Sequence, residues 1–341
     1  MKYIHVFALF LIPVFHTGCG QNQTNIVQDN FSKAHNGYSE SQLKEAATSK
    51  VPISMVRNVK QDRNGNILIP ASWGGVFRYN EKSFTNLTSS KIDRHRFWDV
   101  LEDRKGNLWF ASTDSGVYSY NGKSFQHFTT REGLASNMVM FIYEDRAGNI
   151  WFSGGGLSRY DGKSFQNFTT KDGLPHAGGR AIMEDKTGKV WIATGEGPCF
   201  YDGKTFTVLK NKDGKAFDNV WSIIEDKKGN IWFGADGLWR YDGSTFTKVS
   251  QRDAYAIIED KKGNIWTTGG VKLTGDWALS RYDAKSLYDE MPIVTEIMSG
   301  PPAFFGLLEA NDGSIWFGSG GGVYRYDGKT ITDFKSKEGK K

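Results

Sequence analysis

The stretch EDRAGNIWF at residues 144–152, followed after a glycine-rich gap by GLSRYDGKSF at residues 156–165, recurs along the whole chain. The glycine of its first part and the tyrosine of its second part each appear seven times, with a period of about forty residues. Two separate markers with one period indicate an internal repeat. The glycines are Gly65, Gly106, Gly148, Gly188, Gly229, Gly263 and Gly313, and the tyrosines are Tyr79, Tyr120, Tyr160, Tyr201, Tyr241, Tyr282 and Tyr326.

Each repeat is expected to form four short antiparallel strands. In the fifth copy these fall at residues 220–224, 230–233, 237–241 and 245–248, where apolar and β-branched residues lie between turn-forming residues. The Asp161-Gly162 pair of the third copy predicts a tight hairpin in which both residues take a positive φ. The Asp-x-x-Gly-Asn connection between the first two strands is longer and places its glycine in the left-handed conformation.

Four strands at this period predict an all-β fold, a seven-bladed β-propeller of four-stranded antiparallel blades over residues 51–334. One such sheet cannot bury both of its faces, but sheets stacked around a closed ring can. The repeated tryptophans are expected to fill the spaces between blades, with Leu68 in the first copy. They are Trp109, Trp151, Trp191, Trp232, Trp266 and Trp316. Because seven repeats account for the whole segment, no strand shared between the first and last blades is required, although the segment before residue 51 could still add one.

The composition excludes several classes of function. The net charge is +5, and charges of both signs are interspersed, which does not favour nucleic acid as a partner. The two cysteines, Cys19 and Cys199, match no metal-binding spacing, so we expect no metal and no cofactor.

The N-terminus is typical of an exported protein. Residues 1–18 combine an early Lys2 with an apolar run too short to span a bilayer, which predicts a signal peptide. The small residues before Cys19 resemble a bacterial lipoprotein cleavage site, although His16 departs from the usual leucine; ordinary secretion is the alternative. We therefore expect a lipid anchor at Cys19, a polar tether over 19–50 with a marginal helix at 39–47, a tail over 335–341, and a location in the cell envelope, at the inner or the outer membrane.

The repeat resembles the two-component regulator propeller repeat of bacterial extracytoplasmic sensors. The matching residues are 144–152 and 156–161, with equivalents in every copy. The resemblance implies the propeller fold strongly and the function weakly. Propellers of that family often precede a membrane helix and a histidine kinase. This sequence contains neither, so we expect a standalone form that does not itself carry out phosphotransfer.

Function is expected where the seven copies differ. Five residues before the repeat aspartate, or its equivalent Ala310, every copy has a large residue, and the copies do not agree in its type. One interpretation is that these residues pack between neighbouring blades. The other is that they line the channel mouth, where aromatic faces stack on sugars and arginines bind carboxylate or sulfate. The residues are Arg57, Trp98, Met140, Arg180, Trp221, Tyr255 and Phe305.

Three further residues join this candidate ligand-binding set. Trp73 lies in the loop between the second and third strands of the first copy, and Trp277 lies in an insertion of the sixth copy at 269–278. Arg96 precedes the first strand of the second copy and adds positive charge at the same mouth. The insertion is predicted to be either a binding loop or a lid packed on the mouth.

Catalysis is the weaker hypothesis. His95 and His176 precede first strands at similar depth and could face each other as a base pair or a metal site. Streptogramin lyase-like enzymes are similar in fold, with histidine at the propeller mouth, but this sequence shows no nucleophile–base motif. The leading hypothesis is a non-catalytic module that binds a glycan, a peptide or an envelope protein, with a role in sensing. The alternatives are a lyase or hydrolase that uses these histidines, and an assembly scaffold.

Overall fold

The computed structural model describes residues 38–88, 92 and 95–335 of the chain. The chain divides into two units, residues 1–43 and residues 44–341. Of the first unit only residues 38–43 are described, and they include the start of helix α2 (Glu40–Thr48). The predicted signal peptide and Cys19 lie outside the described residues. No helix in the described ranges is long and apolar enough to cross a membrane.

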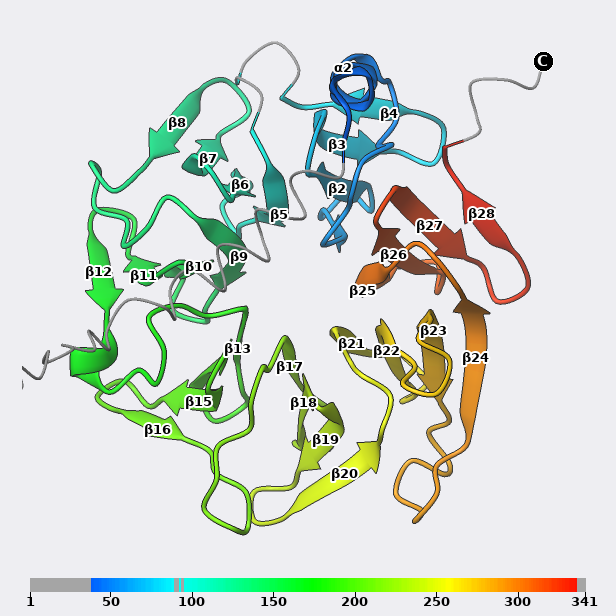
Figure 1. The fold of residues 1–341 in the computed structure, drawn as a ribbon. Coiled ribbons are helices and arrows are strands. Elements are labelled where there is room, and N and C mark those ends of the chain that lie inside the picture. Colours follow the sequence, from blue (N-terminus) through cyan, green and yellow to red (C-terminus); the bar gives the residue numbers. More distant parts are fainter. Residues whose placement is uncertain (1–37, 89–91, 93–94, 336–341) are drawn as a thin grey trace, which may run out of the picture. The chain divides into compact units, whose positions relative to one another are not determined.

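The second unit contains seven sheets, each made of four consecutive antiparallel strands (Figure 1), which confirms the predicted seven-bladed β-propeller. The first four blades, in chain order, comprise β1 (Lys60–Gln61), β2 (Ile67–Ala71), β3 (Gly75–Tyr79) and β4 (Phe84–Asn86); β5 (Phe97–Glu102), β6 (Leu108–Ser112), β7 (Gly116–Tyr120) and β8 (Phe125–Phe128); β9 (Val139–Glu144), β10 (Ile150–Gly154), β11 (Leu157–Tyr160) and β12 (Phe165–Phe168); and β13 (Ala181–Glu184), β14 (Val190–Thr194), β15 (Gly197–Tyr201) and β16 (Phe206–Val208).

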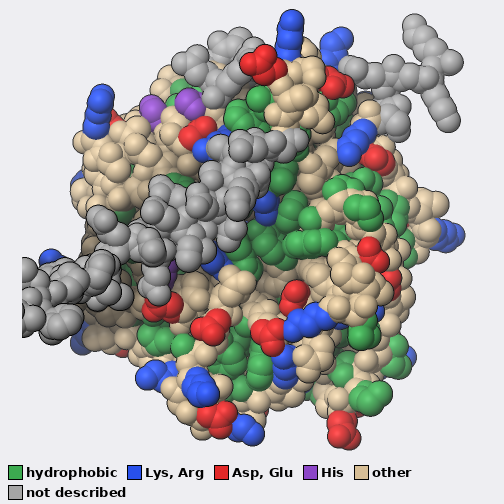
Figure 2. All heavy atoms as spheres, in the orientation of Figure 1, with side chains coloured by type: hydrophobic (Ala, Val, Ile, Leu, Met, Phe, Trp, Pro, Cys, Tyr) green, Lys and Arg blue, Asp and Glu red, His purple; other side chains and the backbone are tan. Residues whose placement is uncertain are grey.

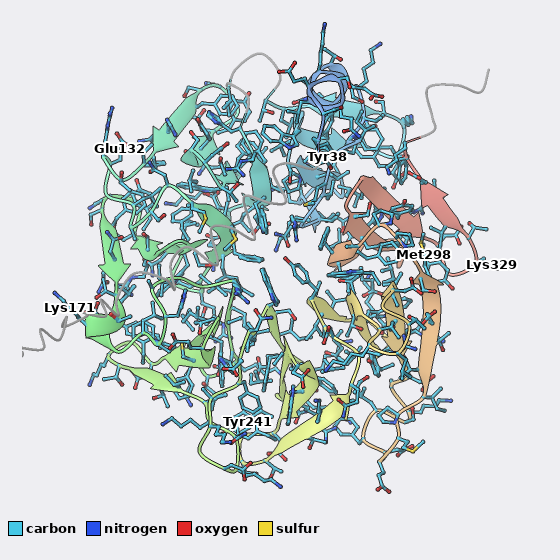
Figure 3. The ribbon with its side chains drawn as sticks, viewed as in Figure 1. Tyr38, Glu132, Lys171, Tyr241, Met298 and Lys329 are labelled. Carbon is cyan, nitrogen blue, oxygen red and sulfur yellow. The ribbon has the colours of Figure 1, made fainter. Side chains whose placement is uncertain are left out.

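The remaining three blades repeat this order. They comprise β17 (Ser222–Glu225), β18 (Ile231–Ala235), β19 (Gly237–Tyr241) and β20 (Phe246–Ser250); β21 (Ala256–Glu259), β22 (Ile265–Gly270), β23 (Trp277–Tyr282) and β24 (Val294–Ser299); and β25 (Phe304–Glu309), β26 (Ile315–Ser319), β27 (Gly322–Tyr326) and β28 (Ile331–Asp333). A 3₁₀ turn, η2 (Thr170–Asp172), follows the third blade. Side chains fill the spaces between neighbouring sheets (Figure 3).

The repeated tryptophans are buried, and the repeat aspartate orients them. In the second to sixth blades the indole Nε1 donates to the aspartate carboxylate six residues earlier, at 2.7–2.9 Å. The same carboxylate accepts the backbone N–H of its own turn, as Asp226 does from Asn230 at 2.8 Å. In the seventh blade Ala310 replaces the aspartate, and the Ser314 hydroxyl accepts from Trp316 instead. One carboxylate thus fixes both the turn and the core.

The glutamate beside this aspartate joins neighbouring blades. It accepts the backbone N–H that follows the aspartate of the preceding blade, as Glu225 does from Lys186 at 2.9 Å. The same bond recurs at Glu102, Glu144, Glu184, Glu259 and Glu309. Between the last and first blades Gln61 takes this role and accepts from Asn311 at 3.0 Å. Every boundary between blades therefore carries the same link.

Within residues 38–335, as far as they are described, the ring closes without a shared strand. Each end blade draws all four strands from one continuous segment. Backbone hydrogen bonds cross the boundary between the first and last blades, from Val56 to Ser319 at 2.9 Å and from Gly306 to Arg57 at 3.0 Å. Backbone contacts and the Gln61 link replace a strand exchanged between the two ends.

The hairpin between the third and fourth strands differs from the prediction. Gly162 has a φ of 95°, but Asp161 is not among the described non-glycine residues with a positive φ. Strand pairing ends at Tyr160 and Phe165, which leaves a four-residue connection. The Asp161 carboxylate accepts the backbone N–H groups of Lys163 and Ser164, each at 2.8 Å. The expectation of two positive φ angles was wrong, because the side chain of the aspartate stabilises the turn instead.

Candidate functional site

The seven residues of the predicted ring lie at the start of the first strand of each blade. Trp98, Met140 and Phe305 belong to β5, β9 and β25 and are buried. The other four stand just before β1, β13, β17 and β21 and are partly exposed: Arg57, Arg180, Trp221 and Tyr255. On the face seen in Figure 2, hydrophobic side chains gather at the centre of the propeller beside Lys and Arg side chains.

The Arg57 side chain contacts several of these central residues. Its guanidinium carbon lies 4.6 Å from the ring centroid of Trp98 and 3.9 Å from that of Phe305. Its Nη1 donates to the Tyr255 hydroxyl at 2.8 Å, and its Nε lies 2.9 Å from the sulfur of Met55. One side chain of the first blade thus contacts the second, sixth and seventh blades.

The contacts continue from Tyr255 across the fifth blade to the fourth. Tyr255 stacks on Trp221 with centroids 4.6 Å apart, and the Arg180 guanidinium lies 3.9 Å over the Trp221 ring. Trp277, from the insertion in the sixth blade, packs against Tyr255 at 5.8 Å and against Phe305 at 5.5 Å. We call this group the aromatic–arginine cluster; its members are Arg57, Trp98, Arg180, Trp221, Tyr255, Trp277 and Phe305.

The cluster carries positive charge that no carboxylate neutralises. In the described part of the chain, no acidic group lies within ion-pair distance of Arg57 or Arg180. Burial lowers the pKa of the Arg180 guanidinium, and burial raises the pKa of the Tyr255 hydroxyl, which the two arginines partly oppose. Asn219 holds Arg180 by accepting from its Nη1. Two guanidiniums on aromatic faces without a counter-ion suit an anionic ligand.

Sequence reasoning did not identify Asn219. It has a φ of 57°, in the left-handed region that asparagine tolerates better than most residues. This backbone conformation lies two residues before Trp221 and accompanies the side-chain bond to Arg180. The signal available in the sequence was that an asparagine, a residue that tolerates a positive φ, stands at a position where this copy differs from the repeat.

Two of the predicted ligand-binding residues have other contacts. The Arg96 side chain pairs with Asp114, Nε to Oδ2 at 3.2 Å. The backbone of Trp73 exchanges hydrogen bonds with the Ser54 hydroxyl, at 2.6 and 2.9 Å. Both lie outside the contacts described for the cluster.

The two candidate catalytic histidines are engaged within their own blades. His95 lies 3.6 Å from Asp114 and stacks near Tyr118 at 5.7 Å. The Nδ1 of His176 lies within hydrogen-bond distance of the backbone of Gly178. Over the described ranges there is no group of three or more His, Cys, Asp or Glu residues that could hold a metal ion.

His176 nevertheless shares a small space with Arg180. A Cβ placed on Gly195 would lie 3.8 Å from Arg180 Nη2 and 3.9 Å from His176 Nε2. The loop between β14 and β15 therefore places Gly195 beside both side chains.

Comparisons with known proteins agree with this architecture. The family model described as two component regulator propeller matches residues 133–156 and 214–237, within the third and fifth repeats. No curated protein matches the sequence at a significant level.

Several solved structures share the fold. The extracellular domain of a hybrid two component system of B. thetaiotaomicron superposes with a TM-score of 0.65 at 19% identity, covering 80% of this chain and 39% of that chain. Virginiamycin B lyase of Staphylococcus aureus gives 0.63 at 15% identity, covering 79% and 93%. PorZ, a surface component of the type-IX secretion system of Porphyromonas gingivalis, gives 0.55 at 16% identity, covering 85% and 49%.

At these identities the structural likeness shows the fold alone, and this chain spans about two fifths of the length of the first relative. The repeat family rests on the two matched stretches and on the residues they share with the other five copies. Residues 133–156 and 214–237 are thus similar to the two component regulator propeller repeat, and the chain folds as a seven-bladed β-propeller.

Proposed function

We propose that this chain is a lipid-anchored, extracytoplasmic binding module that takes an anionic ligand at the aromatic–arginine cluster. The observation that carries the proposal is the pair of guanidiniums, Arg57 and Arg180, held on aromatic faces without a carboxylate partner in the described residues. Arg57 already uses most of its polar atoms within the cluster, so Arg180 is the main contact for the ligand.

The ligand class we favour is an acidic glycan. Aromatic faces such as Trp221 stack on the apolar faces of sugars, and an arginine fork binds carboxylate or sulfate with two parallel hydrogen bonds. A sensing role is in keeping with the extracellular relative from a two component system. A peptide or an envelope protein with an acidic side chain would meet the same groups.

The test is a titration of the purified propeller with acidic oligosaccharides and with neutral ones of the same length. Arg180→Gln and Trp221→Ala should each weaken binding of the acidic ligand at least about tenfold, a loss of about 1.4 kcal/mol. Arg159→Gln is the matched control, because Arg159 also lies over a tryptophan ring but belongs to a different site. Equal affinity of the wild type and Arg180→Gln for the acidic ligand would contradict the proposal.

We favour binding over the lyase alternative, because His95 lies beside Asp114 at 3.6 Å and His176 bonds to the backbone of Gly178, and no contact joins the two histidines among the described residues. A His95→Ala/His176→Ala variant should keep the affinity for the ligand. Turnover of a bound ligand by the wild type that disappears in this variant would instead establish an enzyme.

The anchor is tested separately. Metabolic labelling with palmitate should mark the wild-type protein and be lost in Cys19→Ala. Persistent labelling of Cys19→Ala, or no labelling of the wild type expressed in a bacterium, would contradict lipidation and leave ordinary secretion.

A further inference from the structure

The fifth and sixth blades share one set of five side chains that the other blades lack in full. In the fifth blade the set is Asp226, Lys228, Asn230, Trp232 and Arg240, and in the sixth it is Asp260, Lys262, Asn264, Trp266 and Arg281. Every other blade replaces at least one member: Leu68, Ser119, Ala147, Phe200 and Ala310 are the clearest replacements. Two identical sets in adjacent blades can be compared directly.

In the fifth blade a tyrosine occupies the set. The Tyr288 ring lies 3.8 Å from the Lys228 ammonium and 4.4 Å from the Arg240 guanidinium. Its hydroxyl lies 3.4 Å from Asp226 Oδ2 and accepts from Asn230 Nδ2 at 3.2 Å. Two cations thus face the ring while the carboxylate and the amide bind its hydroxyl.

The source of Tyr288 explains why the sixth blade has no such occupant. Tyr288 comes from the long connection between β23 and β24, where strand pairing stops at Tyr282 and resumes at Val294. In the seventh blade the corresponding pairing stops at Tyr326 and resumes at Ile331, around the tight Asp327-Gly328 turn. Residues 327–330 of this turn include no aromatic side chain, and Tyr326, at its start, packs its ring against Trp266 with centroids 6.1 Å apart.

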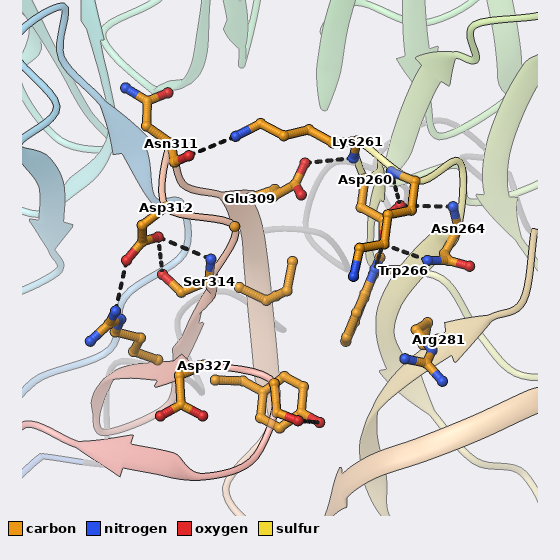
Figure 4. Close-up of a pocket in the computed structure, with 16 residues that line it drawn as sticks. Asp260, Lys261, Asn264, Trp266, Arg281, Glu309, Asn311, Asp312, Ser314 and Asp327 are labelled. Atoms are coloured by element: carbon orange, nitrogen blue, oxygen red, sulfur yellow. Dashed lines mark hydrogen bonds and ion pairs between the residues drawn. The ribbon is translucent and has the colours of Figure 1, made fainter.

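A cavity of about 540 Å³ lies between the sixth and seventh blades, lined by the whole set of the sixth blade (Figure 4). Asp327 and Gly328 form part of its wall. The Nε atoms of Arg78, Arg281 and Arg325 are all buried without a hydrogen-bond partner, but among the described residues the Arg281 side chain has no other hydrogen bond or ion pair either. Equivalent arginines have partners: Arg78 pairs with Asp62, Arg159 with Gln166 and Arg325 with Asp312.

The charges in this cavity are otherwise satisfied. Asp312 pairs with Arg325 at 2.7 Å, and Glu309 accepts the backbone N–H of Lys261 at 2.7 Å. Lys261 Nζ donates to the backbone of Asn311 at 2.8 Å. Lys262 and Arg281 are the two cations left to face a ligand, as Lys228 and Arg240 face Tyr288.

We propose that this cavity binds a tyrosine side chain of a partner polypeptide. The ring would lie against the Lys262 ammonium and the Arg281 guanidinium, and the hydroxyl would meet Asp260 and Asn264. Tyr288, bound by the equivalent residues of the fifth blade, is an example of such an occupant within the chain itself. This site is separate from the aromatic–arginine cluster and does not depend on the ligand proposed there. We expect a single tyrosine side chain to bind with a dissociation constant on the order of millimolar. A partner polypeptide would therefore need further contacts elsewhere on the propeller to bind more tightly.

The experiment uses N-acetyl-tyrosinamide as the probe and ligand-observed NMR as the measurement. The wild type should bind it saturably and prefer it to N-acetyl-phenylalaninamide, which lacks the hydroxyl. Arg281→Gln should weaken binding at least about tenfold, and Arg159→Gln, at the equivalent position of the third blade, should leave it unchanged. Lys262→Ala, an exposed substitution, tests the same site should Arg281→Gln fail to fold.

A second experiment removes Tyr288 from the equivalent residues of the fifth blade. Tyr288→Ala should expose the set in the fifth blade and add a second site for the probe, which Arg240→Gln in the same background should remove. Saturable binding that survives both Arg281→Gln and Lys262→Ala would place the probe elsewhere and overturn the proposal. The proposal also fails if the wild type does not bind, whatever Tyr288→Ala does.

Discussion

Removal of the Arg57 guanidinium should destabilise the propeller because it removes contacts with three other blades. Each cation–π contact, to Trp98 and to Phe305, is worth about 0.5–1 kcal/mol for a group that is partly exposed. The hydrogen bond to the Tyr255 hydroxyl has a charged donor and adds about 1.5 kcal/mol. Together these contacts sum to about 2.5–3.5 kcal/mol, so we expect Arg57→Ala to lower the free energy of unfolding by about that amount.

A double-mutant cycle isolates the bond between Arg57 and Tyr255. Tyr255→Phe removes the hydroxyl but keeps the ring that stacks on Trp221. Since the hydroxyl is the only group the second substitution deletes, the coupling energy of the cycle should be about 1–1.5 kcal/mol.

Urea unfolding of the four proteins, followed by tryptophan fluorescence and circular dichroism, measures the cycle. Arg159→Ala is the control, because its guanidinium lies farther from its rings, at 5.6 Å from Trp151 and 6.0 Å from Phe168, and we expect it to cost less than about 1 kcal/mol. Strictly additive effects of Arg57→Ala and Tyr255→Phe would refute the coupling. A cost of Arg57→Ala equal to that of Arg159→Ala would refute the central role of Arg57.

Three further predictions concern the scaffold. Burial alone would raise the pKa values of the Asp226 and Asp260 carboxyls, but hydrogen bonds from Trp232, Trp266 and the neighbouring asparagines hold both below the ordinary value. Their stabilising effect should therefore be complete above about pH 4 and lost as the pH falls through the folded-state pKa, so that Tm declines in acid, and less so in Trp232→Phe; an equal decline in both proteins would contradict this. A Cβ on Gly234 would lie 1.7 Å from the backbone oxygen of Ala254 in the next blade, so Gly234→Ala should cost about 2–3 kcal/mol in urea unfolding, and a cost near zero would show that the blades can separate freely. Burial raises the pKa of the Cys199 thiol to about 12, so in a Cys19→Ala background Cys199 should react with a disulfide reagent at pH 8 only after unfolding; rapid reaction of the native protein would argue against this burial.

The sequence predicts the fold well because each blade repeats a local pattern. The strand periods, the turn glycines and the tryptophans such as Trp232 are properties of a single repeat, so seven copies predict seven blades. The links between blades are not local. Glu225 is the last residue of β17, yet its carboxylate binds the N–H of Lys186 in the preceding blade, a contact that exists only once neighbouring blades have packed.

The candidate site was predictable in position but not in connectivity. The offset of five residues from the repeat aspartate identifies the start of every first strand, and the structure places the seven residues there. Which of them touch depends on side-chain length and on the geometry of the ring. Arg57 reaches Tyr255 two blades away, whereas Arg96 is drawn to Asp114 in its own blade.

The proposed tyrosine site lies beside the Asp-Gly turns, which belong to the repeat consensus and not to the positions where the copies differ. We propose it because one connection differs in length: the long β23–β24 connection brings Tyr288 to the fifth blade, while the short β27–β28 turn brings no tyrosine to the equivalent residues of the sixth blade. Departures from a repeat can therefore act through the neighbouring copy as well as through their own.

Because no strand is shared among the described blades, each blade is one continuous segment of the chain as well as one sheet. All four strands of the first and last blades come from continuous segments, and the boundary between them carries the same kind of side-chain link as the other six. The fold would therefore be the same if the chain began and ended between any other two blades. A circular permutant that joins residue 334 to residue 51 and opens between the fourth and fifth blades would keep every strand within its own sheet. Duplication or exchange of whole blades would likewise leave the order of strands within each sheet unchanged.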